Sequence, residues 1–226
     1  MMKILALLIL LALSAGAHAD VVYLPTPHGA ERFKRAASRP ETLALLGFVE
    51  SQTRQTFCGP ASLAAALNSL GIMDPTPAPL FPYHLLTQDS VFTSENQAVK
   101  TYTKVETVGL TLNELARFAA NFGVSVEVIH AADVSAEAMR TKLRAALAAP
   151  GVRVIVNYSR IPLDQAGDGH ISPVAAYDAD SDSFLVLDVA RYKYPPAWVS
   201  FDQLLAAMQR VDSDSGESRG ALILTR

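Results

Sequence analysis

The amino-acid sequence predicts an α+β fold, in which an N-terminal helical part packs on an antiparallel β-sheet. Segments with helical periodicity dominate before residue 150, and short β-branched runs separated by turn residues dominate after it. Helices followed by strands are typical of a two-layer α+β domain, whereas alternating units predict a parallel sheet. Half of the residues are apolar and the formal net charge is −3, with no basic stripe. This composition indicates a globular protein and does not support nucleic-acid binding.

Residues 1–19 have the pattern of a secretory signal peptide. Lys3 supplies a basic start, Ile4–Leu13 is an apolar run, and Ala17-His-Ala19 fits the small-x-small cleavage pattern. The run is too short to span a bilayer, which takes roughly 20 apolar residues. We therefore expect residues 20–226 to form a single domain. We expect it to be periplasmic or secreted, without a membrane anchor after signal cleavage.

Three helices are predicted before residue 75. A short one covers 30–38, a second covers 41–51, and a third begins at Cys58 and ends near Gly71, where glycine can take the left-handed cap. Four prolines between residues 73 and 83 predict an irregular connection. No regular pattern is evident at 87–102.

The rest of the chain has clearer patterns. Thr111–Phe122 is amphipathic, and Thr111 with Glu114 three residues later predicts a capping box. A strand at 124–130 and a helix at 134–149 follow. Further strands are predicted at 152–158, 171–177, 184–189 and 220–225, with a helix at 200–210.

Cys58 is the only cysteine in the chain. Pro60 suits the first turn of a helix, so Cys58 is placed at a helix N-terminus, where free N–H groups and the helix dipole stabilise a thiolate. The simpler interpretation is a small apolar core residue. If the protein is exported, its single cysteine has no partner for a disulfide within the chain. This favours the interpretation of Cys58 as a reactive thiol.

A thiolate nucleophile needs a base, and the base needs an orienting acceptor. His170 begins a strand directly after Gly167-Asp-Gly169, which gives a base a rigid mount with open access. Asp188 ends the apolar run Phe184–Leu187, where a carboxylate is costly to bury without a partner. If these two strands are antiparallel neighbours, Asp188 accepts a hydrogen bond from His170. The alternatives are a histidine satisfied by backbone groups and an aspartate that caps a turn.

Gln52 precedes Cys58 by six residues. Its side-chain amide is placed to stabilise an oxyanion together with the backbone N–H of Cys58. Surface glutamines are common, so this pattern is weak. No histidine or carboxylate cluster has the spacing of a metal site.

Several blocks of the sequence resemble the phytochelatin synthase family. The likeness runs from about Gly29 to the C-terminus. The block from Asp188 to Trp198 is long and particular enough that chance is a poor explanation. The matching blocks are Gln52…Phe57-Cys-Gly59 with Asn68-Ser-Leu-Gly71, Gly169-His-Ile-Ser-Pro173, Asp188-Val-Ala-Arg-Tyr-Lys-Tyr-Pro-Pro-Ala-Trp198 and Val211-Asp212…Arg219-Gly220.

This resemblance implies a papain-like cysteine-enzyme fold that acts on glutathione. It implies that Cys58 is the nucleophile, His170 the general base, Asp188 its orienting acceptor and Gln52 the oxyanion-hole amide. The thiolate then cleaves the Cys–Gly bond, glycine leaves, and the γ-glutamylcysteinyl group passes to water or to another glutathione.

The resemblance also implies a substrate site. Arg219, supported by Asp212, is expected to bind the glutamyl end of glutathione, and guanidinium is a suitable carboxylate partner. Asn157 is a weaker candidate for the same pocket. The chain resembles short bacterial members, which chiefly hydrolyse glutathione, because it has one cysteine and lacks the cysteine-rich extension of plant members.

No cofactor is expected to be required, and Cd²⁺ or Zn²⁺ would enter as thiolate complexes of the substrate. The expected partners are glutathione and related thiol peptides, and a homodimer remains an option. Two other functions stay open: an exported papain-like cysteine peptidase acting on other peptides, and a non-catalytic periplasmic module that binds glutathione.

Overall fold

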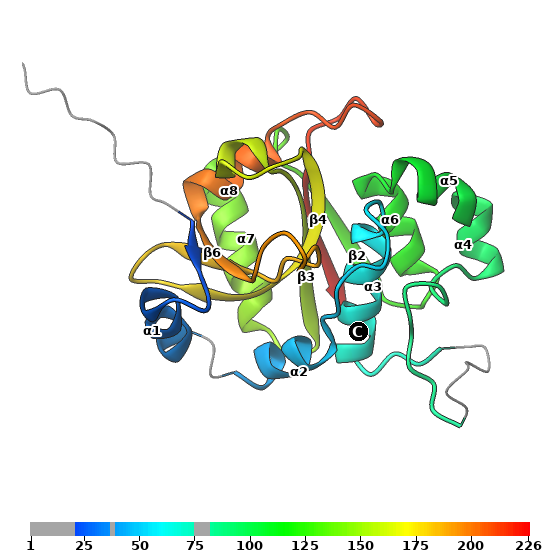
Figure 1. The fold of residues 1–226 in the computed structure, drawn as a ribbon, viewed down its shortest axis with the longest axis horizontal. Helices are drawn as coiled ribbons and strands as arrows, with labels where there is room; N and C mark the ends of the chain where they lie inside the picture. Colours follow the sequence, from blue (N-terminus) through cyan, green and yellow to red (C-terminus); the bar gives the residue numbers. More distant parts are fainter. Residues whose placement is uncertain (1–20, 37–38, 75–81) are drawn as a thin grey trace, which may run out of the picture.

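A computed structural model describes residues 21–36, 39–74 and 82–226. The predicted signal peptide and most of the proline-rich connection lie outside these residues. In the described part, seven strands form one sheet in the order β1-β6-β5-β4-β3-β7-β2, and every neighbouring pair is antiparallel (Figure 1). The predicted α+β class is confirmed, with an N-terminal helical part packed on an antiparallel sheet.

The helices and strands follow the predicted order closely, with their ends shifted by a few residues. The elements are β1 (Val22–Tyr23), α1 (Pro27–Ala36), α2 (Pro40–Phe48), α3 (Cys58–Ser69), α4 (Ser94–Val99), α5 (Tyr102–Val108), α6 (Leu112–Ala120), β2 (Ser125–His130), α7 (Ala136–Ala148), β3 (Val152–Ser159), a 3₁₀ turn η1 (Ile161–Leu163), β4 (Gly169–Asp178), β5 (Ser183–Val186), β6 (Ala197–Ser200), α8 (Phe201–Met208) and β7 (Gly220–Thr225).

The sheet is covered on both faces, so the expected two-layer arrangement is wrong. In β3, Ile155 packs with α3 and α6, whereas Val154 and Val156 pack with α7 and α8. Successive residues of a strand point to opposite faces, so both sets are buried only if helices lie on each side. Figure 1 shows α3 and α6 on one side of the central strands and α7 and α8 on the other. The order of elements could not reveal this, because it does not fix which face each helix covers.

Helix α3 is the buried helix of the domain. Every residue from Gly59 to Leu67 is buried, and small alanines let the helix lie close to the sheet. Leu63 and Leu67 have no exposed surface, and burial of each contributes about 1.5–3 kcal/mol. The helix ends as predicted, with Gly71 at φ +70°. This packing gives Cys58, its first residue, a rigid mount against β4.

Among the described residues, the sequence patterns did not predict the 3₁₀ turn η1, nor did they predict four further elements. Two are the short helices α4 and α5, which are capped by the side chains of Thr93 and Thr101. The others are the strands β1 and β6, of two and four residues. Elements of this length carry too few residues for periodicity to be recognised.

Candidate active site

Cys58 is the first residue of α3 and is partly exposed. The residue before it, Phe57, offers no side-chain cap, so the N–H groups of the first turn remain available to the sulfur. Burial raises the pKa of the Cys58 thiol. The hydrogen bond to His170, the charge of His170, and backbone hydrogen bonds at Ile171 and Gly59 outweigh burial and hold that pKa below its usual range. The site therefore favours a thiolate.

His170 lies on β4 and is 4% exposed. Its Nε2 is 2.8 Å from Oδ1 of Asp188, which leaves Nδ1 for the hydrogen bond with Cys58. The ring of Tyr158 meets the imidazole edge to face, with centroids 5.6 Å apart. Burial lowers the pKa of His170, but hydrogen bonds to Asp188 and Cys58 outweigh burial and raise it. Both shifts favour an imidazolium beside a thiolate.

Asp188 follows β5, which is antiparallel to β4. The backbone bond from Leu187 N to Pro173 O, 2.8 Å long, extends this pairing to the residue before Asp188. Oδ1 also accepts from the N–H of Ala190 at 2.8 Å. The strand pairing expected from the sequence is present, and it brings His170 and Asp188 together.

Arg160 is a member of this site that the sequence patterns did not single out. Its Nη2 lies 2.9 Å from Oδ1 and 2.7 Å from Oδ2 of Asp188, and both side chains are almost fully buried. Burial raises the pKa of Asp188, but His170 and Arg160 outweigh burial and hold it below its usual range. An arginine directly after a buried strand was the available signal. Its partner is 28 residues away in the sequence, so the pairing could not be read from the sequence.

Gln52 is buried in the turn that leads to Cys58. Its Nε2 donates to the carbonyl oxygens of Arg54 at 2.8 Å and Gln55 at 2.9 Å, and lies 3.0 Å from the hydroxyl of Tyr192. Its backbone N–H donates to Val189 O at 2.8 Å, which ties this turn to the Asp188 loop. Gln52 does not line the cavity at Cys58. Its oxyanion role remains a prediction.

A cavity of about 290 Å³ opens at Cys58 and His170. The three residues expected to bind substrate, Asn157, Asp212 and Arg219, line the same cavity. Its complete lining is Gln55, Thr56, Cys58, Val108, Gly109, Leu110, Asn157, Asp168, Gly169, His170, Ile171, Asp212, Ser213, Asp214 and Arg219.

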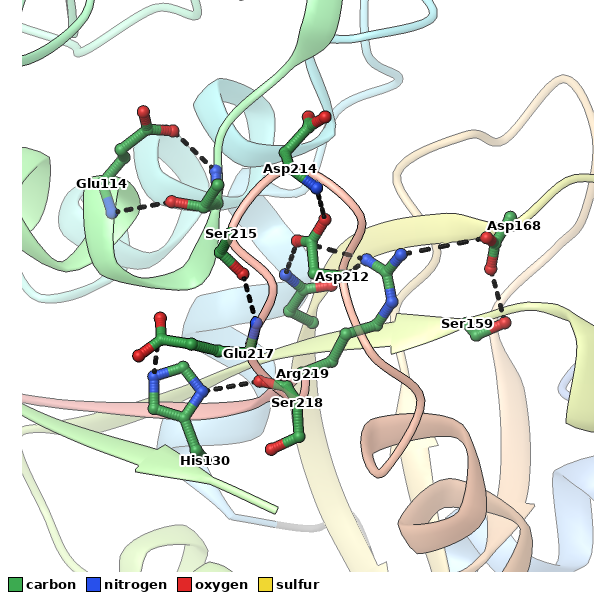
Figure 2. A network of polar contacts seen from close by, with 12 residues as sticks. Glu114, His130, Ser159, Asp168, Asp212, Asp214, Ser215, Glu217, Ser218 and Arg219 are labelled. Atoms are coloured by element: carbon green, nitrogen blue, oxygen red, sulfur yellow. Dashed lines mark hydrogen bonds and ion pairs between the residues drawn. The ribbon is translucent and has the colours of Figure 1, made fainter. Parts of the chain in front are cut away.

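Arg219 is the buried cation of this cavity, 5% exposed. Its Nη1 donates to Oδ1 of Asn157 at 2.9 Å and lies 3.5 Å from Oδ2 of Asp212. On the other side, Nη2 lies 4.0 Å from Oδ2 of Asp168, as Figure 2 shows. Its buried Nε has no hydrogen-bond partner in the described part of the chain. The guanidinium is therefore fixed in place with a donor left over.

A group of polar contacts that we call the clasp fastens the loop carrying Asp212 to β2 and α6. Figure 2 shows the contacts that His130 of β2 makes with this loop. His130 Nδ1 donates to Ser218 O at 2.6 Å, and Asn113 Nδ2 donates to Oε2 of Glu217 at 2.7 Å. The hydroxyl of Ser218 accepts from the backbone of Ala132 at 3.0 Å. His130 thus supports the base of the loop.

No helix in the described residues is long and apolar enough to cross a bilayer. Within residues 21–36, 39–74 and 82–226, no group of three or more His, Cys, Asp and Glu side chains is arranged to hold a metal ion.

The site has a cysteine at the start of a buried helix and a histidine–aspartate pair on neighbouring strands. Along the chain the cysteine comes first, then the histidine, then the residue that orients it, as in a papain-like cysteine site. The model of the phytochelatin synthase family matches residues 17–221. The chain therefore belongs to the phytochelatin synthase family, and the resemblance seen in the sequence is confirmed.

Named relatives agree with this assignment. "Glutathione gamma-glutamylcysteinyltransferase 1" of Lotus japonicus is 33% identical over 182 residues, which cover 80% of this chain and 35% of the relative. "Glutathione gamma-glutamylcysteinyltransferase 2" of Arabidopsis thaliana is 31% identical over 80% of this chain and 39% of its own length. The Schizosaccharomyces pombe enzyme of that name is 29% identical over 77% and 41%. The match thus spans well under half of each relative.

Among solved structures, the Pseudomonas avirulence protein AvrPphB matches with a TM-score of 0.35 and 11% sequence identity. The match covers 80% of this chain and 98% of that one. A similarity this low supports no conclusion about function.

Proposed function

We propose that this protein is a glutathione γ-glutamylcysteine dipeptidyltransferase whose main outcome is hydrolysis. One observation carries the proposal: the same cavity is lined by Cys58 and by Arg219. The lowered pKa of Cys58 favours its thiolate form, and Arg219 contributes a buried guanidinium. Glutathione offers a carboxylate at its glutamyl end and a peptide carbonyl at the Cys–Gly bond. The names of the relatives support the same substrate.

The reaction begins with attack of the Cys58 thiolate on the carbonyl carbon of the Cys–Gly bond. The imidazolium of His170 donates its proton to the glycine nitrogen as the C–N bond breaks, and free glycine leaves. The γ-glutamylcysteinyl group remains as a thioester on Sγ. His170, now neutral, takes a proton from an attacking water or from the amino group of a second glutathione. The C–S bond of the thioester then breaks, and the thiolate and imidazolium are restored.

The substrate is held at its glutamyl end. The guanidinium of Arg219, fixed by Asn157 and Asp212, binds the carboxylate in a planar geometry that suits it. The backbone N–H of Cys58 stabilises the oxyanion, and the amide of Gln52 joins it by exchanging a bond to the carbonyl of Arg54 or Gln55 for one to the substrate. Asp188 keeps the imidazole in the orientation that places Nδ1 at Sγ.

Two competing functions make different predictions. A cysteine peptidase would cleave longer peptides and leave glutathione intact. A non-catalytic glutathione-binding module would leave Cys58 unreactive, and the lowered pKa of its thiol disfavours that role.

We also propose export to the periplasm or beyond the cell after cleavage following Ala19. Heavy-metal ions such as Cd²⁺ or Zn²⁺ would act through substrate thiolates, which would connect the protein to heavy-metal detoxification. A homodimer is the assembly to test first. N-terminal sequencing of the periplasmic protein would check export and cleavage after Ala19. Light scattering would check the homodimer.

The central experiment incubates the purified protein with glutathione, with and without Cd²⁺, and resolves the products by mass. Glycine with γ-glutamylcysteine indicates hydrolysis, and longer oligomers indicate transfer. Cys58→Ala should abolish glycine release while circular dichroism and Tm stay those of the wild type. Glycine release by this variant at the wild-type rate would rule out the mechanism.

A further inference from the structure

Arg160 and Asp188 form a buried ion pair behind the candidate catalytic histidine. Arg160 is 2% exposed and Asp188 is 3% exposed. Nη2 of Arg160 contacts both carboxylate oxygens, at 2.9 and 2.7 Å. Nη1 donates to Oε1 of Gln165 at 2.6 Å, so the guanidinium is held from both ends.

The charges of the site explain why a cation is needed there. In papain-like proteases the third residue is an asparagine, so thiolate and imidazolium balance each other. Here the third residue is an aspartate, and a thiolate, an imidazolium and a carboxylate leave one uncompensated negative charge in a buried place. An unpaired buried charge is strongly unfavourable. The guanidinium of Arg160, which stays protonated in proteins, brings the sum to zero.

We propose that Arg160 is a positioning residue that supplies the countercharge of Asp188. It thereby lets Asp188 remain ionised behind His170 while Cys58 is a thiolate. The proposal rests on the function proposed above for Cys58, His170 and Asp188. Arg160 acts through Asp188 and does not line the cavity.

The fold holds the Arg160 side chain beside this carboxylate. Its backbone N–H donates to Asp168 O at 3.0 Å directly after β3 ends. Its guanidinium lies 5.9 Å from the ring centroid of Tyr158 and 5.1 Å from that of Tyr194. These aromatic faces stabilise a cation.

The titratable groups around the pair come from four parts of the fold. His170 faces Asp188 from β4, and Cys58 acts from α3 through His170. Tyr158 of β3 and Tyr194, which precedes β6, face Arg160. Burial raises the pKa of Tyr158, so this residue stays neutral. Among these groups, Arg160 alone carries a positive charge that no proton transfer in the reaction removes.

The test uses Arg160→Met, which keeps an apolar stem between the two tyrosines, and the double variant Arg160→Met with Asp188→Asn. Arg153→Met is the matched control, since Arg153 is a buried arginine of β3 that bonds to Ser69, away from the site. Two readouts are taken: glycine release from glutathione, and the pH midpoint of Cys58 alkylation by iodoacetamide.

Removing the cation should raise the pH midpoint of alkylation in Arg160→Met by roughly one unit or more. Glycine release should fall on the order of 100-fold. The double variant has a neutral third residue, so its midpoint should return toward the wild-type value. Its glycine release should exceed that of Arg160→Met roughly tenfold. Arg153→Met should lower Tm and leave the midpoint unchanged.

Two results together would overturn the proposal: an unchanged pH midpoint of alkylation in Arg160→Met, and glycine release by the double variant no faster than that of Arg160→Met. If Arg160→Met does not fold, Arg160→Lys is the deciding variant. It keeps the positive charge, so its alkylation midpoint should equal that of the wild type. An upward shift of the midpoint in Arg160→Lys would contradict the countercharge role. Wild-type protein that releases no glycine would refute the proposed function alone, because alkylation needs no glutathione.

Discussion

The guanidinium of Arg219 lies directly against Gly169, the residue before His170. A Cβ atom at Gly169 would be 2.6 Å from Nη1 and 2.8 Å from Nη2 of Arg219. Glycine therefore permits the guanidinium to lie beside the strand that carries the candidate base. This contact joins the predicted substrate site to the predicted catalytic site in one cavity.

Gly169→Ala should damage substrate binding more than chemistry. The added methyl group displaces a guanidinium at the end of a flexible side chain, so the fold survives while Arg219 loses its place beside Asn157. We expect KM for glutathione to rise roughly tenfold or more, because this change corresponds to the free energy of one lost charge-assisted hydrogen bond. The rate of Cys58 alkylation should stay within about twofold of wild type, since Arg219 does not contact the thiol.

Gly47→Ala is the control for this substitution. A Cβ atom at Gly47, inside α2, meets nothing within 4 Å. The change should leave KM unaltered and stabilise the helix by about 0.5–1 kcal/mol. Equal KM values for Gly169→Ala and wild type would show that Arg219 does not bind the substrate.

The pH dependence of Cys58 alkylation reports the thiolate–imidazolium pair. The pKa of Cys58 is held below its usual range and that of His170 is raised. The thiolate should therefore react at pH values well under the midpoint of a free thiol, about 8.5. His170→Ala removes the hydrogen bond and the charge, so the midpoint should move upward. A wild-type midpoint equal to that of glutathione, alkylated under the same conditions, would contradict the pair.

The clasp around His130 should affect substrate binding at a distance. His130→Ala removes the bond to Ser218 O and loosens the loop that carries Asp212. We expect KM for glutathione to rise roughly three- to tenfold, equivalent to about 1 kcal/mol for one hydrogen bond. His84→Ala is the control, because its Nδ1 also lies near a backbone oxygen, that of Asp74 at 3.1 Å. Similar KM values for both variants would show that the clasp does not hold the site.

The sequence predicted those elements whose signals are local. The capping box of α6 is present as expected, with Thr111 and Glu114 each bonding the other's backbone. Cys58 could be placed at a helix start because Pro60 and the alanines that follow act within a few residues. The pairing of the strands before and after Asp178 followed from the short turn between them.

Long-range contacts explain what the sequence could not show. Arg219 meets Asn157 across 62 residues, and Arg160 meets Asp188 across 28. Such pairs depend on strand order, and the order β4-β3-β7 is not written in any local pattern. The short elements α4, α5, β1 and β6 owe their form to packing and caps, so intrinsic propensity alone is too weak to indicate them.

Two roles compete for the side-chain amide of Gln52. As an oxyanion donor it should contribute to kcat, and removal of such a donor costs about 10²- to 10³-fold. As a brace for the turn before Cys58, where it bonds the carbonyls of Arg54 and Gln55, it should contribute to Tm instead.

Gln52→Ala separates the roles when kcat and Tm are measured together. Tyr192→Phe is the partner variant, because it removes only the hydroxyl that lies 3.0 Å from Nε2. A loss of kcat in Gln52→Ala with Tm nearly unchanged, and little effect in Tyr192→Phe, supports the oxyanion role. A lower Tm with kcat within about threefold of wild type would assign Gln52 to the turn, since so small a loss is well below that of an oxyanion donor.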